Sequence, residues 1–427
     1  MTKYNVLIFP SCSEVGLASY ECLKNHKNFF IIGGSNDGKI SKNVFENLIT
    51  GIPYVDSPNF LEYFNKIIHE YKIDVIIPCN DLVALELSKN QDKINTKIAG
   101  SCYLTNQIAF SKKKTYEILS GIIKTPKIFD YNEIKNCDFP LFLKPDNGHS
   151  AIGTNKVNNF EELDFYLKKN RDLIILEFLP GEEYTIDCFT DNDGVLRYCK
   201  SRVRVSVKSG MSVNTKFVEN NDVFIEIAEK INDKFKFNGG WFFQLKLNSS
   251  NCPVMLEIST RLAGNSNASL LNGVNFPLLN IYNSLNQKVD IIDNDCVVEM
   301  SKINSSKYIL KKNDFKTIYI DLDDTIILKE IVNLDAIKFL YHCFNTKKEI
   351  ILITRHKFDI SRTFEKFKIP NLFSSIIHIK DNKPKSFFID KNKIKDSIFI
   401  DDSFAERLDV AKQGVTTYDI EMIGYLI

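Results

Sequence analysis

Two aspartates toward the end of the sequence have the spacing of a phosphoryl-transfer site. Residues 316–327 read Lys-Thr-Ile-Tyr-Ile-Asp-Leu-Asp-Asp-Thr-Ile-Ile, which predicts a buried strand that ends at Asp321 and Asp323. Because side chains alternate between the faces of a strand, both carboxylates can share one face at its carboxyl end, where parallel α/β sheets place their chemistry. A carboxylate can attack phosphorus when a cation offsets the repulsion between the two anions.

Two further apolar runs end on polar side chains in the same way. Residues 348–355 place Thr354 near the end of one run, and residues 396–403 place Asp401 and Asp402 at the end of the other. Between them, Lys383 and Lys385 flank a proline just before a helix-like Ser-Phe-Phe-Ile segment. An Asp-x-Asp pair alone also fits an ordinary strand-end turn, but all these elements in this order favour a site.

The order Asp-x-Asp-x-Thr, Thr, Lys, Asp-Asp resembles the haloacid dehalogenase-like (HAD) phosphatase superfamily. The resemblance implies that Asp321 is a nucleophile that becomes an aspartyl phosphate, and that Asp323 is the acid or base on the leaving oxygen. It also implies that Thr354 and Lys385 hold the phosphoryl oxygens, with Lys383 as the other candidate lysine.

The same carboxylates predict a Mg²⁺ site, with Mn²⁺ as an alternative ion. Asp321 and Asp402 can hold the ion through hard oxygen ligands, and Asp323 and Asp401 complete the candidate set.

Only short segments separate Thr325 from Thr354 and Thr354 from Lys385, which leaves no room for a large cap domain. We therefore expect a capless, open site that suits a bulky or extended phosphorylated substrate, unless a neighbouring domain serves as the lid. Residues 401–407 also resemble motifs of a glyceryl-transferring branch of the superfamily, which leaves the acceptor open.

Length and charge narrow the class of protein. At about 150 residues per domain, a chain of 427 residues predicts roughly three domains. The net charge is +1 and no long basic run occurs, so the electrostatic footprint of a nucleic-acid binder is missing.

Cysteine usage and hydropathy indicate a cytoplasmic location. The ten cysteines form no Cys-x-x-Cys pair and the six histidines show no ligand spacing, so neither zinc nor a disulfide framework is expected. The first residues predict a strand rather than a signal peptide, and no run approaches the ~20 apolar residues of a membrane helix. A reducing cytoplasm suits such a chain.

Residues 1–110 alternate short β-branched runs with helix-like stretches, which predicts a doubly wound α/β domain. The turn at 11–16 follows the first strand but lacks Gly-x-Gly-x-x-Gly, so an ordinary strand-to-helix turn is favoured over a dinucleotide site.

A second group of polar residues lies in the middle of the chain. The predicted strand 139–145 carries Lys144, and a loop with Gly148, Ser150 and Gly153 follows it. Small residues and free backbone amides suit phosphate.

Carboxylates and an arginine recur along the apolar strands that come next. Glu177 follows a buried run, Glu183 follows a tight turn, and Gln244, Glu257 and Arg261 lie on what the pattern predicts as adjacent strands. Polar groups placed on such strands need a partner such as a metal ion or phosphate.

These residues, in this order, resemble the ATP-grasp superfamily, whose members bind MgATP between two α+β lobes and usually phosphorylate a carboxylate so that an amine or thiol can displace the phosphate. This resemblance covers about residues 1–300, and the HAD resemblance covers 316–427; together they imply an α/β and α+β multidomain fold. Its parts are a Rossmann-like pre-ATP-grasp domain (1–110), a two-lobed ATP-grasp domain (111–300), a linker (301–315) and a capless HAD-like Rossmannoid domain (316–427).

The same resemblance implies roles for the nucleotide-binding residues. Lys144 would lie near the α-phosphate and adenine, and the glycine loop would cover the phosphates. Glu177 would meet adenine at the hinge and Glu183 would meet the ribose. Lys112, the first of three consecutive lysines, would contact phosphate.

The candidate Mg²⁺ ligands depart from the pattern of the ATP-grasp superfamily. Gln244 and Glu257 stand where Mg²⁺ ligands occur, and Arg261 stands where an arginine stabilises the transferring phosphoryl group. Ser259 replaces the asparagine of the usual Glu-x-Asn-x-Arg, which removes a carbonyl ligand and implies a weaker site or a shell completed by water.

Two arginines between these motifs, Arg202 and Arg204, leave two readings open. They could bind an anionic co-substrate, or they could be solvated side chains at a strand edge.

Together the two resemblances predict a bifunctional enzyme. One part would be an ATP-dependent ligase that joins a carboxylate to an amine, and the other a Mg²⁺-dependent phosphatase that acts on a phosphomonoester, with polysaccharide or small-metabolite decoration as a possible setting. A homodimer is compatible with this scheme, whereas nucleic acid and membrane are not expected as partners. The alternatives are a nucleotide-binding scaffold with a decayed grasp site beside an active phosphatase, and a small-molecule kinase.

Overall fold

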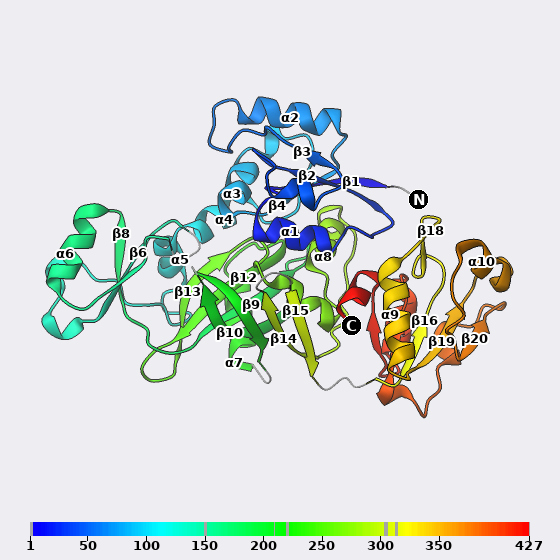
Figure 1. Cartoon of the computed structure of the whole chain (residues 1–427). Coiled ribbons are helices and arrows are strands. Elements are labelled where there is room, and N and C mark those ends of the chain that lie inside the picture. The colour runs from blue at the N-terminus through cyan, green and yellow to red at the C-terminus, as the bar shows by residue number, and fades with distance from the viewer. Residues whose placement is uncertain are drawn as a thin grey trace.

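A computed structural model describes residues 3–148, 152–208, 210–218, 222–302, 306–311 and 315–426 of the chain. The described residues form sheets of five, three, seven and five strands, and a short hairpin. Figure 1 shows the N-terminal sheet above the seven-stranded sheet, with the three-stranded sheet at one end of the molecule and the C-terminal sheet at the other.

The N-terminal sheet is parallel and has the order β3-β2-β1-β4-β5. Its strands are β1 (Tyr4–Phe9), β2 (Phe29–Gly34), β3 (Leu48–Ile49), β4 (Val75–Pro78) and β5 (Lys97–Ile98), and its helices are α1 (Glu14–Glu21), α2 (Phe60–Glu70) and α3 (Asp81–Lys89). Leu7, Ile76 and Phe64 are fully buried. The apolar strand runs and the amphipathic helices therefore form the expected doubly wound unit.

The three-stranded sheet is antiparallel, with the order β7-β6-β8. It comprises β6 (Leu141–Pro145), β7 (Asn155–Val157) and β8 (Leu173–Glu177), and α6 (Phe160–Lys169) belongs to the same lobe. Leu141, Leu143 and Leu163 share its small core. Helices α4 (Tyr103–Phe110) and α5 (Lys112–Leu119) precede it in the chain.

The seven-stranded sheet is antiparallel and has the order β13-β12-β9-β10-β11-β14-β15. Its elements are β9 (Glu183–Thr190), β10 (Leu196–Lys208), β11 (Met211–Phe217), α7 (Asp222–Asn232), β12 (Gly239–Leu247), β13 (Pro253–Ser259), α8 (Phe276–Ser284), β14 (Val297–Lys302) and β15 (Ser306–Lys311). Trp241 is buried in it and stacks on Phe237, with ring centroids 3.8 Å apart.

The linker expected at 301–315 is wrong in part. Its residues 306–311 form β15, which pairs antiparallel with β14 along six residue pairs. Tyr308 and Ile309, at the centre of this segment, are strand-favouring residues. The segment also covers the edge of β14, whose backbone groups would otherwise be unpaired.

The C-terminal sheet is parallel and has the order β20-β19-β16-β21-β22. It contains β16 (Thr317–Ile320), β19 (Glu349–Thr354), β20 (Ser375–His378), β21 (Ser397–Ile400) and β22 (Thr416–Tyr418), with α9 (Leu334–Asn345), α10 (Ile360–Phe367) and α11 (Phe404–Ala411) between strands. The hairpin β17 (Ile327–Leu328) and β18 (Ile331–Val332) follows β16. The chain adds strands on one side of β16 and then on the other, so the sheet has its switch point at β16, where such folds bind ligands.

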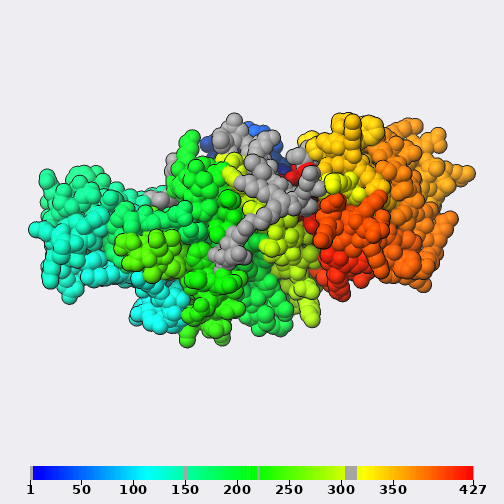
Figure 2. Space-filling view, turned by 90° about the horizontal axis from the view of Figure 1, so that it is seen from below, coloured from blue at the N-terminus to red at the C-terminus, as the bar shows by residue number. Residues whose placement is uncertain are grey.

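One hydrophobic cluster joins three of these sheets. It contains Val6 of the N-terminal sheet, Phe276 beside the seven-stranded sheet, and Ile320 and Met422 of the C-terminal part. Figure 2 shows the orange and red C-terminal part packed against the yellow-green strands. Among the described residues, no helix is long and apolar enough to span a bilayer.

Candidate active sites

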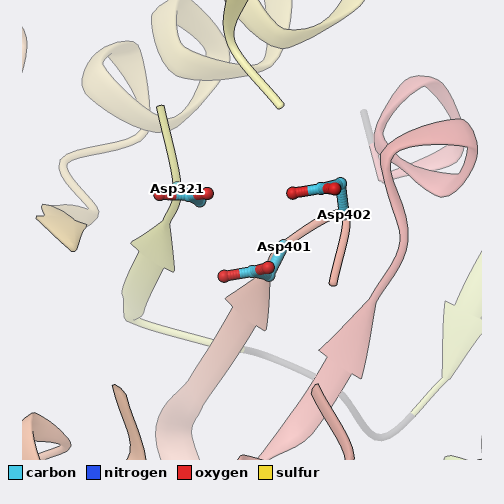
Figure 3. Close-up of side chains that lie close together, drawn as sticks. All are labelled: Asp321, Asp401 and Asp402. Atoms are coloured by element: carbon cyan, nitrogen blue, oxygen red, sulfur yellow. The ribbon is translucent and has the colours of Figure 1, made fainter. Parts of the chain in front are cut away.

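The carboxyl end of the C-terminal sheet gathers three aspartates from two neighbouring strands. Asp321 follows β16, and Asp401 and Asp402 follow β21. One carboxylate oxygen of each lies within 4.8 Å of the others, and Figure 3 shows the side chains around a common space. The strands are parallel and adjacent, so their carboxyl ends meet at one edge.

Lys385 inserts its ammonium group into this acidic cluster. It begins the short helix η6 (Lys385–Phe388), is 3% exposed, and places Nζ 2.9 Å from Asp321 Oδ1 and 2.6 Å from Asp401 Oδ2. Lys383, the other candidate, is half-exposed and pairs with Asp381 at 3.7 Å. Of the two lysines, the structure brings Lys385 to the site.

The acidic cluster has the donor set that a hard divalent cation needs. Burial, reinforced by the Asp401 carboxylate, raises the pKa of Asp321 to about 7, and burial also raises the pKa of Asp401. Asp321 Oδ1 and Asp401 Oδ2 both face the Lys385 ammonium, so these two carboxylates share one countercharge. Three carboxylates around a single buried ammonium therefore fit Mg²⁺ or Mn²⁺.

Asp323 lies outside this cluster, which corrects its place in the expected metal-ligand set. The strand ends at Ile320, so alternation along a strand does not extend to Asp323, and Asp324 beyond it adopts a left-handed backbone with φ of +55°. His356 Nδ1 lies 2.8 Å from Asp323 Oδ1, and its Nε2 lies 2.7 Å from Thr363 Oγ1. A half-exposed carboxylate held in this way suits proton transfer better than metal binding.

Thr354 ends β19 and is fully buried. Its Oγ1 accepts a hydrogen bond from the His356 backbone N–H at 3.1 Å. His356 was not singled out from the sequence; its place directly after the β19 run is the signal that could have found it.

The acidic site is less open than the sequence predicts. Lys27, from the loop between α1 and β2, donates hydrogen bonds to Asp402 and to Asp324, the latter at 2.9 Å. The N-terminal part thus reaches the site as a lid would. Because Lys27 and Asp402 are 375 residues apart, no local sequence pattern could have revealed this contact.

A second site lies between the three-stranded and seven-stranded sheets. It is a cavity of about 230 Å³. Its lining includes most of the residues expected to bind nucleotide, namely Lys112, Lys144, Gly148, Glu177 and Glu183, and two of the expected metal ligands, Gln244 and Glu257. The apolar side chains Ile152, Phe178 and Leu179 also face it.

Lys144 lies on β6 and is 6% exposed. Its Nζ donates to Tyr116 Oη at 2.8 Å and to the Leu256 carbonyl at 3.0 Å. Burial lowers the pKa of Lys144 to about 7. Lys112 is also buried, and its Nζ donates to the carbonyls of Asp146 and Gly148, both at 3.2 Å.

Two carboxylates reach the cavity from the ends of strands. Glu177 ends β8, and its Oε1 accepts a hydrogen bond from the Lys127 N–H at 3.0 Å. Glu183 begins β9 and pairs with the guanidinium of Arg204.

The glycine loop is only partly at the cavity. Gly153 is exposed and adopts a left-handed backbone with φ of +76°, and its neighbours Ile152 and Thr154, rather than Gly153 itself, line the cavity. Ser150 lies outside the described residues.

Gln244 and Glu257 are direct partners on β12 and β13. Both line the nucleotide-side cavity and also a second cavity of about 270 Å³. The second cavity is further lined by Arg202, Arg204 and Arg261. The amide and carboxylate therefore stand at the border between the two cavities.

The interpretation of Arg202 as a solvated edge residue is wrong. Arg202 is 3% exposed, because β10 is an interior strand between β9 and β11. Its Nε donates to Asp187 Oδ2 at 2.7 Å, and its Nη2 to Oδ1 at 3.3 Å. This fork arrangement fixes the cation next to the second cavity.

Arg261 and Ser259 are both tied to Asp81, the first residue of α3. Arg261 Nε donates to Asp81 Oδ2 at 3.0 Å, and Ser259 Oγ donates to Asp81 Oδ1 at 2.5 Å. Ser259 lines neither cavity, so the structure does not bring it to the other candidate metal ligands. Asp81 was missed because it lies in the N-terminal domain, far away in sequence.

Sequence comparisons match the middle of the chain. The model of a family described as "ATP-grasp in the biosynthetic pathway with Ter operon" matches residues 169–306. The D-alanine–D-alanine ligase of Fusobacterium nucleatum subsp. nucleatum is 35% identical over 97 residues, which is 22% of this chain and 33% of that protein. The D-alanine–D-alanine ligase of Marinomonas sp. is 33% identical over 104 residues, again 22% and 33%. The chain thus spans about a third of the length of these curated relatives.

Solved structures match a larger share. The biotin carboxylase domain of Hydrogenobacter thermophilus 2-oxoglutarate carboxylase, in complex with MgADP, ADP and bicarbonate, has a TM-score of 0.59 and 13% identity over 70% of this chain and 74% of its own. The L-amino acid ligase of Bacillus licheniformis has a TM-score of 0.57 and 14% identity over 70% and 79%. The N5-carboxyaminoimidazole synthetase of Staphylococcus aureus, complexed with ADP, has a TM-score of 0.56 and 15% identity over 70% and 83%. At these identities the likeness shows the fold.

Proposed function

We propose that this chain, which has the ATP-grasp fold, is an ATP-dependent carboxylate–amine ligase that also carries a phosphatase site. The observation that carries the ligase proposal is the pair Gln244 and Glu257, which borders two cavities at once. A phosphoryl group must pass from a nucleotide on one side to an acceptor on the other, and these residues stand where it would cross.

In this scheme the first cavity holds ATP. Lys144 and Lys112 place positive charge against its phosphates, and Glu177 and Glu183 accept hydrogen bonds from its adenine and ribose. Gln244 and Glu257 would hold Mg²⁺, which offsets the charge of the transferring group.

The second cavity holds the carboxylate to be activated. Its arginines, Arg202, Arg204 and Arg261, suit an anionic substrate. The carboxylate oxygen attacks the γ-phosphorus and ADP leaves; an amine then attacks the acyl phosphate carbon, loses a proton and expels phosphate. The names of two neighbours, D-alanine–D-alanine ligase and L-amino acid ligase, favour amino-acid-like substrates.

The C-terminal sheet supports a HAD-like phosphomonoesterase, in which Asp321, Asp401 and Asp402 would hold Mg²⁺. An Asp321 oxygen attacks phosphorus while Asp323, oriented by His356, gives its proton to the leaving alcohol. Asp323 then takes a proton from water, which attacks the aspartyl phosphate and releases phosphate.

The fusion of the two parts supports a sequence of steps. A phosphorylated amino alcohol or sugar acid would enter ligation, and the phosphatase site would then remove its phosphate. The decoration of a polysaccharide or of a small metabolite in the cytoplasm fits such a product.

The test of the ligase uses the full chain with Asp321→Asn, so that the C-terminal site releases no phosphate. ATP is followed by ³¹P NMR with Mg²⁺ and pooled carboxylates and amines. We expect ADP and phosphate only when both pools are present, and loss of turnover in Glu257→Ala and Arg261→Ala. A phosphorylated acceptor would instead identify a kinase.

One observation favours a second candidate, a nucleotide-binding scaffold. The Ser259 hydroxyl is engaged by Asp81, and an amide stands at 244, so the metal shell has few charged ligands. Bound but intact ATP in the same NMR experiment would select this candidate and leave phosphate release, abolished by Asp321→Asn, as the activity of the chain.

A further inference from the structure

The contact of Lys27 with the acidic cluster crosses from the N-terminal part to the C-terminal part. Its ammonium group bridges two loops of the cluster, binding Asp402 after β21 and Asp324 after β16. The Lys27 side chain is 23% exposed, and that of Asp402 is 15% exposed. The charge is therefore presented at the mouth of the site and partly shielded from water.

The loop that carries Lys27 is held from several directions. The His26 ring stacks on Phe29, with centroids 4.4 Å apart, and the His26 carbonyl accepts a hydrogen bond from Lys329 Nζ at 3.3 Å. Asn28 Nδ2 donates to Tyr282 Oη at 3.3 Å. Lys27 is thus placed by neighbours from all three parts of the chain.

A cavity of about 490 Å³ lies beside this contact, at the junction of the three parts. Lys27 and Asp402 form part of its wall, together with the apolar faces of Leu278, Tyr282 and Phe404 and the guanidinium of Arg407. Its size and mixed polarity suit a small organic group rather than phosphate alone.

Charge balance explains why a further cation is useful here. Asp321, Asp401 and Asp402 gather at the reacting position, Asp324 is joined to them through Lys27, and a phosphomonoester adds more negative charge. Among the described residues, the buried Lys385 ammonium pairs with Asp321 and Asp401, and the buried Arg407 guanidinium donates to the Asp401 carbonyl. Lys27 reduces the repulsion that the substrate meets.

We infer that the N-terminal part completes the phosphatase site: Lys27 binds the phosphoryl group of a phosphomonoester, and the junction cavity receives the organic group attached to it. This inference rests on the proposed phosphatase function. Lys27 is then a substrate-binding residue, and the cavity sets which leaving alcohols are accepted.

The test compares full-length variants on two probes, acetyl phosphate and 1-naphthyl phosphate. Lys27→Met should raise KM for both by about tenfold, the usual effect of losing one charged hydrogen bond, with a smaller change in kcat. Lys27→Arg should restore KM to within about threefold of the wild type. Lys24→Met is the matched control. Lys24 lies in the same loop after α1 as Lys27, but it pairs with Glu21 rather than with the acidic cluster.

The cavity is tested by filling it. Leu278→Trp should raise KM for 1-naphthyl phosphate by about tenfold and leave acetyl phosphate unchanged, since the added ring occupies the space of the organic group. The control is Leu334→Trp, at a position 77% exposed on α9. An unchanged KM for 1-naphthyl phosphate in Leu278→Trp would overturn the cavity assignment.

A second readout does not depend on turnover. Without the Lys27 charge, Mn²⁺ should bind the acidic cluster several-fold more tightly, measured from free Mn²⁺ by electron paramagnetic resonance. Unchanged Mn²⁺ affinity together with a wild-type KM in Lys27→Met overturns the inference, while the phosphatase assignment stands.

If neither probe is hydrolysed by the wild type, the phosphatase proposal fails and the inference about Lys27 fails with it. Lys27→Gln replaces Lys27→Met if the latter has a lower melting temperature than Lys24→Met.

Discussion

Lys144 is a lysine whose surroundings favour the neutral amine. Burial lowers its pKa from 10.5 to about 7, so at pH 8 the free protein holds it mostly unprotonated. The phosphates of a nucleotide favour the ammonium form and raise the pKa again. Between about pH 7 and 10.5, binding of the nucleotide must therefore be coupled to proton uptake.

This linkage predicts that MgATP binding at pH 8 takes up close to one proton. Isothermal titration calorimetry in buffers of different ionisation enthalpy measures the uptake directly. At pH 6, where Lys144 is already charged, the uptake should nearly vanish. Lys144→Met should show none at pH 8, and an equal uptake in that variant would assign the proton to another group.

At the scale of single elements, the central strand of the C-terminal sheet positions the acidic cluster. β16 is only four residues long, and both Ile318 and Ile320 are fully buried. Truncation of either leaves a cavity directly beneath Asp321.

Ile320→Ala should lower the free energy of opening of β16 by about 2–5 kcal/mol, the usual cost of removing a large aliphatic side chain from a core. Hydrogen exchange measured by mass spectrometry on peptides that cover β16 reports this value. Ile331→Ala, at a position 70% exposed, is the matched control and should change it by less than about 0.5 kcal/mol. Equal effects of the two changes would contradict the central role of the strand.

The elements show what the sequence could reveal. A strand buried on both faces reads as a continuous apolar run, so β8, β16, β19 and β21 end close to Glu177, Asp321, Thr354 and Asp401, as the sequence predicts. Polar residues at or just after the ends of such strands, among them Asp321, Thr354 and Glu177, are predictable for the same reason.

Contacts made at long range were not predictable from one sequence. Arg261 donates a hydrogen bond to Asp81 across 180 residues, and Lys27 donates one to Asp402 across 375 residues. Asp323 was misplaced among the metal ligands because the position where β16 ends depends on the turn after it. β15 was taken for a linker because its partner strand, β14, was not recognised.

At the scale of the whole molecule, the N-terminal, seven-stranded and C-terminal sheets share one hydrophobic cluster. Met422 belongs to it and is 3% exposed. Hydrogen bonds also cross the boundary, since Asn294 Nδ2 donates to the Thr417 carbonyl at 2.9 Å. Loss of packing at Met422 should thus lower the stability of the seven-stranded and N-terminal sheets as well.

Trp241, the single tryptophan, reports on the seven-stranded sheet. Met422→Asp buries a charge without a matched cation, so the melting temperature followed by Trp241 fluorescence should fall by roughly 5–10 °C. The control Phe358→Asp, at a position 71% exposed, should leave it nearly unchanged. If Met422→Asp left the melting temperature followed by Trp241 fluorescence unchanged, the sheets would unfold independently.

The bridge between Lys27 and Asp402 has a consequence for inheritance. Lys27 and Asp402 are 375 residues apart in the chain, yet they meet at a single site. A protein without the segment that carries Lys27 would leave Asp402 without this cation. The same segment, fused to an unrelated protein, would carry a lysine that has no Asp402 to pair with. We therefore expect homologous genes to keep or change the two codons together.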